Sequence, residues 1–167
     1  MQNKVVHNVL QQYARSGLID SLYLFGNEAI QDFAGEATVS SLYDNINNIV
    51  SNFIITLNWM ENTEPVVGGV FEPKDISRIC TVSVGQIMSD KEDFFFPLQN
   101  ITEATYYYSV SEEDKQNEKN LLTNIRKRVT LNIEEGIECS FGLWENQSDV
   151  SFFYSIKYTH FIQQQEV

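Results

Sequence analysis

The residue types that most often carry out catalysis are rare in this sequence and form no known pattern. There are only two histidines among the 167 residues. His7 lies between Val5 and Val9 in an amphipathic stretch, and His160 follows Tyr158 at the end of an alternating stretch. General acid–base and nucleophilic catalysis need such a side chain beside an activating partner. Because neither histidine has a recognisable partner, we predict no catalytic residue.

The two cysteines, Cys80 and Cys139, each lie in a stretch where apolar residues alternate. A free cysteine in such a place usually behaves as a small apolar core residue. No Cys-x-x-Cys pair is present, and no group of carboxylates has the spacing of a calcium-binding loop. The Gly68-Gly69 pair lacks the other spaced glycines and the Lys-Ser/Thr of a phosphate-binding loop. We therefore expect reduced, buried thiols, no metal site and no cofactor.

Acidic side chains outnumber basic ones by a wide margin. The 23 Asp and Glu residues and the 11 Lys and Arg residues give a formal net charge of −12 at pH 7. Proteins that bind nucleic acids or anionic membranes rely on Lys and Arg, so the composition argues against both ligands. It favours a basic protein partner or simply a soluble chain. Copies of the chain itself in an assembly are the other expected partner.

Apolar residues at helical spacing predict several helices. The clearest stripe consists of Leu42, Ile46, Ile49, Val50 and Phe53. It predicts a helix from Val39 to Asn52 that packs on a sheet, followed by a strand to Met60. Further helices are expected before Gly17 and over residues 27–34 and 111–128, and strands over residues 76–84, 93–98 and 105–110.

The last forty residues predict a three-stranded antiparallel meander. Apolar residues alternate over 129–133, 137–143 and 150–158. Glu134-Glu135-Gly136 is typical of a hairpin turn between the first two strands. The chain is therefore expected to form a single α+β domain over residues 1–167. In this domain two or three helices pack on a mainly antiparallel sheet that ends in the meander.

Acidic residues and a tryptophan beside the meander form the candidate binding site. Strands hold their turns rigidly, so side chains on these turns bind a partner with little further ordering cost. Tryptophan is frequent among the residues that dominate binding. The candidate partner-binding residues are Glu134, Glu135, Glu138, Trp144 and Glu145. The alternative is a solvated acidic rim around a tryptophan that covers the core.

These observations favour a non-enzymatic, acidic protein-binding module. Small size and net negative charge are typical of an inhibitor or immunity-type protein that masks a basic partner. One alternative is a structural subunit of a larger viral or phage assembly, whose neighbour covers the second apolar face of the last strand. Another alternative is an enzyme whose carboxylates meet only in the fold. The sequence has no long apolar stretch and its start does not resemble a signal peptide, so we expect a cytoplasmic protein.

Overall fold

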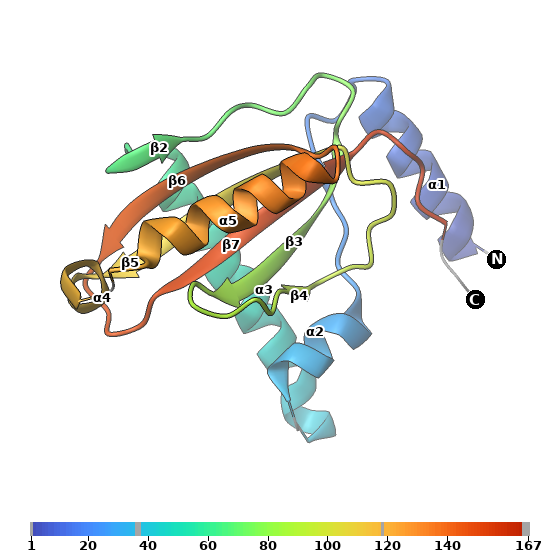
Figure 1. Ribbon diagram of the computed structural model, residues 1–167. Coiled ribbons are helices and arrows are strands. Elements are labelled where there is room, and N and C mark those ends of the chain that lie inside the picture. The colour runs from blue at the N-terminus through green and yellow to red at the C-terminus, as the bar shows by residue number, and fades with distance from the viewer. Residues whose placement is uncertain (1, 36–37, 118, 165–167) are drawn as a thin grey trace.

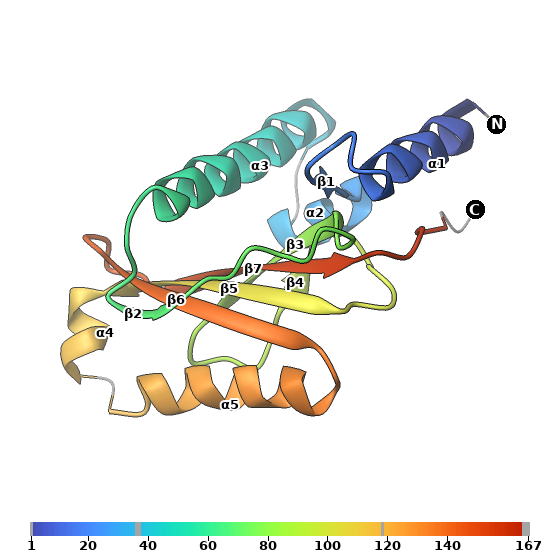
Figure 2. The same ribbon diagram turned by 90° about the horizontal axis from the view of Figure 1, so that it is seen from above.

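The computed structural model describes residues 2–35, 38–117 and 119–164. Within these residues, five helices lie on the two faces of one seven-stranded sheet (Figures 1 and 2). The helices are α1 (Gln2–Arg15), α2 (Asn27–Ala34), α3 (Val39–Glu61), α4 (Glu112–Asn117) and α5 (Leu121–Glu134). The strands are β1 (Leu22–Tyr23), β2 (Val67–Gly69), β3 (Ile79–Gln86), β4 (Asp93–Phe94), β5 (Glu103–Ser111), β6 (Glu138–Asn146) and β7 (Phe152–Thr159).

The sheet is mixed, with strand order β1-β3-β7-β5-β6-β2 and β4 paired to β3. The pairs β1–β3 and β5–β6 are parallel, whereas β3–β7, β5–β7, β2–β6 and β3–β4 are antiparallel. The strand β7 therefore lies in the middle, hydrogen-bonded to β3 on one side and to β5 on the other. This position explains why both faces of β7 carry aromatic residues, since helices cover both faces of the sheet.

One face of the sheet is covered by α3, which continues without a break from Val39 to Glu61. Phe53, Leu57 and Met60 extend the apolar stripe at steps of four and three, and all three are buried. They form a core with Ile46 on the same helix, and with Tyr107, Trp144 and other sheet residues. The prediction that this stripe packs on the sheet is confirmed for Ile46 and Phe53; the side chain of Leu42 lies outside the described residues.

The other face is covered by α5, which with α4 makes the crossover between the parallel strands β5 and β6. Figure 2 shows α5 and α3 on opposite sides of the sheet. Parallel neighbouring strands need such a crossover, because a tight turn can only reverse the chain direction. Leu121 and Ile125 anchor α5 in a second core with Tyr106, Tyr108 and Phe153 of β5 and β7.

The predicted fold class is wrong: the sheet is mixed and does not end in an antiparallel meander. Residues 129–133 are helical and belong to α5, with Leu131 and Ile133 exposed. The next two strands, β6 and β7, do not pair with each other but flank β5. Three alternating apolar positions were too short a pattern to exclude a helix.

The predicted strand up to Met60 is also wrong, because that segment is the second half of α3. The strand was predicted from alternating apolar residues at Phe53, Ile55, Leu57 and Trp59. Two of these residues, Phe53 and Leu57, also belong to the helical stripe, so both patterns fit the segment. The helix wins because it buries Phe53, Leu57 and Met60 together and leaves Ile55 and Trp59 exposed. By contrast, the helix over 27–34 is confirmed, and Ser111 accepts a 3.1 Å bond from the Asp114 amide as the predicted helix cap.

Candidate functional site

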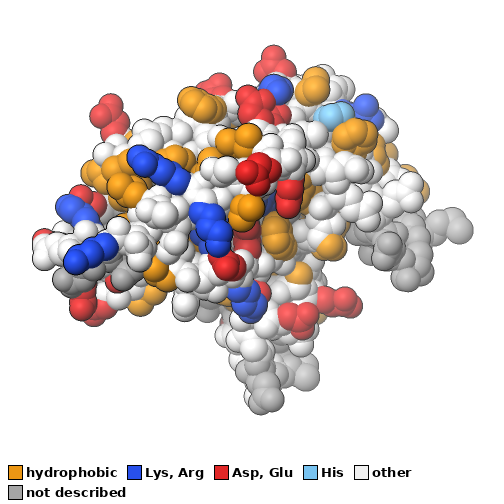
Figure 3. All heavy atoms as spheres, in the orientation of Figure 1, with side chains coloured by type: hydrophobic (Ala, Val, Ile, Leu, Met, Phe, Trp, Pro, Cys, Tyr) orange, Lys and Arg blue, Asp and Glu red, His pale blue; other side chains and the backbone are white. Residues whose placement is uncertain are grey.

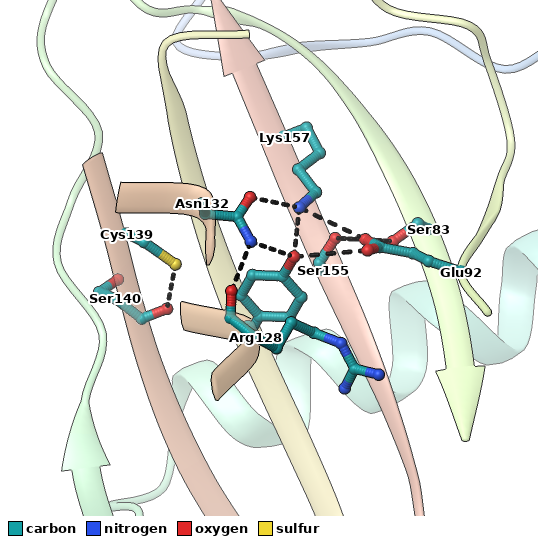
Figure 4. Close-up of polar contacts among 9 residues, drawn as sticks. Ser83, Glu92, Arg128, Asn132, Cys139, Ser140, Ser155 and Lys157 are labelled. Atoms are coloured by element: carbon teal, nitrogen blue, oxygen red, sulfur yellow. Dashed lines mark hydrogen bonds and ion pairs between the residues drawn. The ribbon is translucent and has the colours of Figure 1, made fainter. Parts of the chain in front are cut away.

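A buried polar cluster lies between the sheet and α5, with Lys157 of β7 at its centre (Figure 4). The side chain of Lys157 is 3% exposed, and its ammonium lies 3.4 Å from Glu92 Oε1. It also donates to the hydroxyl of Tyr106 on β5 and, at 3.3 Å, to Asn132 Oδ1 on α5. All three ammonium N–H groups of Lys157 therefore have acceptors within the chain.

The partners of Lys157 are themselves held by further hydrogen bonds. Glu92 Oε1 accepts from Ser155 at 2.7 Å and from Ser83, so β7 and β3 both hold this carboxylate. Asn132 Nδ2 donates to the Tyr106 hydroxyl at 3.1 Å. A buried charge is tolerated when it is paired and hydrogen-bonded in this way. The cluster thus ties together β3, β5, β7, α5 and the segment before β4.

A cavity of about 460 Å³ opens beside the cluster, where Lys127, Arg128, Asp90 and Glu135 join its lining. The guanidinium of Arg128 lies 4.2 Å from the centre of the Phe153 ring, and its Nη2 donates to the Ser89 carbonyl. In the space-filling view, this face carries Lys and Arg side chains beside Asp and Glu side chains (Figure 3). The two signs of charge balance here, so the cavity does not select an anion or a cation by charge alone.

Burial shifts the pKa of three titratable groups in and beside the cluster. Burial lowers the pKa of Lys157, and the charge of Glu92 opposes that shift. Burial raises the pKa of the Tyr106 phenol, and it raises the pKa of the Cys139 thiol to about 11. Phenol and thiol therefore stay protonated at neutral pH and are poor nucleophiles. No group of three His, Cys, Asp or Glu residues within the described ranges is arranged to hold a metal ion.

The five predicted partner-binding residues do not come together in one place. Glu134 and Glu135 lie exposed at the end of α5. Glu138 and Glu145 are on β6 and form ion pairs with Lys74 and Lys115.

The fifth residue, Trp144, is 2% exposed on the α3 side of the sheet, where it stacks on Tyr107 with ring centroids 5.7 Å apart. It belongs to the core, as the sequence-based alternative expected. A role for the five residues in binding a partner stays a prediction.

Both cysteines are free; Cys80 is buried and Cys139 is half-buried. The predicted burial is thus confirmed for Cys80 and only in part for Cys139. No helix in the described segments is long and apolar enough to cross a membrane.

Two helices on the α3 side of the sheet each carry a group of exposed apolar side chains. On α3 the outward-facing residues are Tyr43, Ile54, Ile55 and Trp59. On α1 they are Val5, Val6, Val9, Leu10 and Tyr13. Scattered exposed apolar residues are normal, but a contiguous set on one helix marks a surface for another molecule or another part of an assembly.

Sequence reasoning missed both the lysine cluster and the outward face of α1. A signal for the first was present: Lys157 is the single charged residue in the run from Val150 to Tyr158. A lone charge on a buried strand needs a partner. The face of α1 gave no such signal, because its apolar stripe has the spacing of a helix that packs inward.

No protein-family model matches this sequence, and no curated protein matches it either. Solved structures share its fold. CetZ from Methanosaeta thermophila has a TM-score of 0.57 at 15% identity, over 84% of this chain and 43% of CetZ. CetZ1 from Haloferax volcanii, a GDP-bound monomer, has a TM-score of 0.51 at 16% identity, over 89% of this chain and 49% of CetZ1. TubZ from Bacillus thuringiensis serovar israelensis, in a GTPγS-form protofilament, has a TM-score of 0.53 at 15% identity, over 92% of this chain and 47% of TubZ.

The chain therefore shares the fold of part of CetZ and TubZ, and it spans less than half the length of each of these proteins. This likeness corrects the predicted function. The structures that share its fold support neither an inhibitor or immunity-type module nor a viral or phage subunit. The net negative charge was the basis for predicting a protein that covers a basic partner. Net charge affects solubility and association rates, but it determines neither the fold nor the function.

Proposed function

We propose that this protein assembles copies of itself into filaments. The observation that carries the proposal is the fold shared with TubZ over 92% of this chain, since TubZ was solved as a protofilament. The exposed apolar side chains of α1 and α3 support it, because an assembly would remove them from water. Copies of the chain were one of the two kinds of partner expected from the sequence. A basic partner has no observation in its favour.

We propose that this chain assembles with copies of itself. We do not propose that it hydrolyses a nucleotide by itself. CetZ1 was solved with GDP and TubZ in a GTPγS form. This sequence has no glycine-rich phosphate-binding loop, and its eight glycines are scattered. We place the assembly in the cytoplasm, which agrees with the free thiols of Cys80 and Cys139.

Sedimentation velocity from micromolar to near-millimolar protein tests the proposal. The expected result is a sedimentation coefficient that rises with concentration, together with filaments in negatively stained electron micrographs. A single monomeric species at every concentration would overturn it. The measurement is repeated with added GTP. Filaments that form only with GTP would support assembly and would show that it needs the nucleotide.

A further inference from the structure

Lys157 differs from exposed lysines of the chain in its surroundings. Its side chain is 3% exposed, whereas those of Lys74 and Lys115 are 61% and 48% exposed. Water stabilises the ammonium of an exposed lysine, so its amine is protonated at neutral pH. Burial removes that water and lowers the pKa of Lys157; Glu92 opposes this shift, and Arg128 adds to it. Buried lysines of this kind are the ones that react as amines in proteins.

A path for a proton leads away from Lys157 (Figure 4). Its ammonium donates to the Tyr106 hydroxyl, and that hydroxyl donates to Glu92 Oε2 at 3.4 Å. Glu92 Oε1 already accepts from Ser83 and Ser155, so Oε2 is the oxygen left to take up a proton. Tyr106 can receive the proton of Lys157 while it passes its own to Glu92, without becoming a phenolate. An amine must lose a proton in this way before it acts as a nucleophile.

The cavity beside the cluster connects Lys157 with the surface. Lys157, Tyr106 and Glu92 all line it. Met88 and Leu131 line it too and are 51% and 49% exposed, so its mouth opens to solvent. The other apolar residues in the lining are Ile87, Phe94, Ile101 and Ile137. A volume of about 460 Å³ with apolar walls and convergent polar groups is typical of a small-molecule site, and the balanced charges of the lining suit a molecule without net charge.

The geometry points to Lys157 as a nucleophilic amine that forms an imine with a small, uncharged aldehyde or ketone in this cavity. A carbonyl carbon is the group that a free amine attacks, and Tyr106 and Glu92 provide the proton transfers that the attack needs. All of these residues belong to one chain, so the inference goes beyond the proposed self-assembly and does not depend on it.

The covalent step balances within the cluster. Lys157 gives one ammonium proton to Glu92 through Tyr106, and its nitrogen then bonds to the carbonyl carbon. The electron pair of the C=O double bond moves to the oxygen, which takes the proton back from Glu92. The nitrogen gives a second proton to Glu92, and the hydroxyl group leaves as water with that proton. The product is a protonated imine, whose positive charge keeps the ion pair with Glu92.

Reductive trapping with propanal tests this inference on the natural chain. Sodium cyanoborohydride reduces an imine to a stable propylamine, and mass spectrometry of proteolytic peptides shows which lysine carries the propyl group. Lys127 is the internal control, because it lines the same cavity but is exposed. We expect Lys157 to react at least about tenfold faster than Lys127, since the cavity holds the carbonyl carbon beside its amine. An equal or higher rate at Lys127 would overturn the inference.

Access through the cavity is tested with a tryptophan at its mouth. Leu131→Trp should fill the cavity and slow trapping at Lys157 by about tenfold, because propanal no longer lies beside the amine. The matched control is Leu122→Trp, on the same helix and also partly exposed, where the side chain lines a different pocket. Circular dichroism checks that both variants fold. The same trapping rate at Lys157 in both variants would contradict binding of the aldehyde in this cavity.

Tyr106→Phe tests the proton path, because it keeps the buried ring and removes the hydroxyl. Trapping at Lys157 should slow by about a hundredfold, whereas trapping at Lys127 in the same sample should not change. An unchanged rate at Lys157 would overturn the assigned path. Trapping is measured at a protein concentration where sedimentation shows monomers. A chain that never assembles but traps propanal at Lys157 would refute the proposed self-assembly and support this inference, and filaments without such trapping would do the reverse.

Discussion

Lys157 is the residue on which most of the buried polar contacts converge. It links Glu92, Tyr106 and Asn132, which come from three separate parts of the chain. Breaking such an ion pair lowers the free energy of unfolding mainly because one charge stays buried without a partner. That unpaired charge costs more free energy than the intact pair contributes. The cluster is therefore best tested by removing one partner at a time.

We expect Lys157→Met to lower the free energy of unfolding by about 3 kcal/mol, since it leaves Glu92 without its cation. Urea unfolding followed by fluorescence measures this change. The control is Lys74→Met, which removes an exposed pair with Glu138 and should cause no measurable change. Adding Glu92→Gln to Lys157→Met should recover part of the loss. Equal effects of the two lysine substitutions would count against a structural role for the cluster.

At the scale of elements, α3 and β2 are each expected to be disrupted by a single substitution. α3 runs unbroken through residues that alternate like a strand. β2 is a short edge strand that reaches β6 only because Gly68 adopts a positive φ. β2 depends on backbone geometry more than on the apolar pattern, whereas α3 is favoured by the burial of Phe53, Leu57 and Met60.

Ile54→Pro tests the helix. Ile54 is exposed, so little packing is lost, but proline removes a helical hydrogen bond and clashes with the preceding turn. We expect a loss of about 3 kcal/mol or more in the free energy of unfolding. Ile54→Ala, the control, should change it by less than about 0.5 kcal/mol. Similar values for the two variants would mean that this segment is not helical in solution.

Gly68→Ala tests the edge strand. The φ of Gly68 is 81°, and an added Cβ would lie 2.3 Å from the Phe141 carbonyl oxygen. We expect β2 to detach locally at a cost of about 1–3 kcal/mol. Faster hydrogen exchange at the Val66 amide, which bonds to the Leu143 carbonyl, would report it. At Gly69 an added Cβ meets nothing within 4 Å, so Gly69→Ala should leave this exchange rate unchanged.

At the scale of the whole molecule, the sheet separates two aromatic cores, one under α3 and one under α5. Tyrosine phenols lie in both. Burial raises the pKa of Tyr106, Tyr107 and Tyr158 above the ordinary value of 10.0, and that of Tyr108 to about 12. Each phenol stays protonated in the fold at a pH where it would ionise in the unfolded chain.

The protein should therefore lose stability steeply above pH 10. There the unfolded chain releases phenolic protons that the folded chain keeps, so unfolding becomes more favourable as the pH rises. Each buried phenol contributes about 1.4 kcal/mol per pH unit above 10. Lys157 acts in the opposite direction only below its ordinary value of 10.5, because burial lowers its pKa in the fold and the unfolded chain binds the proton up to that pH.

Denaturant unfolding at a series of pH values measures this dependence, and tyrosinate absorbance tracks the phenols. Below pH 10 these phenols are protonated in both the folded and the unfolded chain, so they should not make the free energy of unfolding depend on pH. Ionisation of most tyrosines before the protein unfolds would contradict their burial.

The sequence by itself determined the features that depend on neighbouring residues. The stripe through Ile46 and Phe53, the cap at Ser111 and the helix over residues 27–34 all follow from local spacing and side-chain type. The thiol of Cys80 was correctly placed in the core for the same reason. Helical and strand periods act over a few residues, so they can be read without the fold.

Only the tertiary structure decided which strands pair, where α3 and α5 end, and which side of α1 faces inward. Alternation is the same in parallel and antiparallel strands, so it could not reveal that β6 pairs with β5 and not with β7. The Lys157–Glu92 and Gln11–Gln163 contacts join residues far apart in the chain. Such contacts arise when packing brings distant segments together, and packing overrides a local pattern wherever it buries more apolar surface.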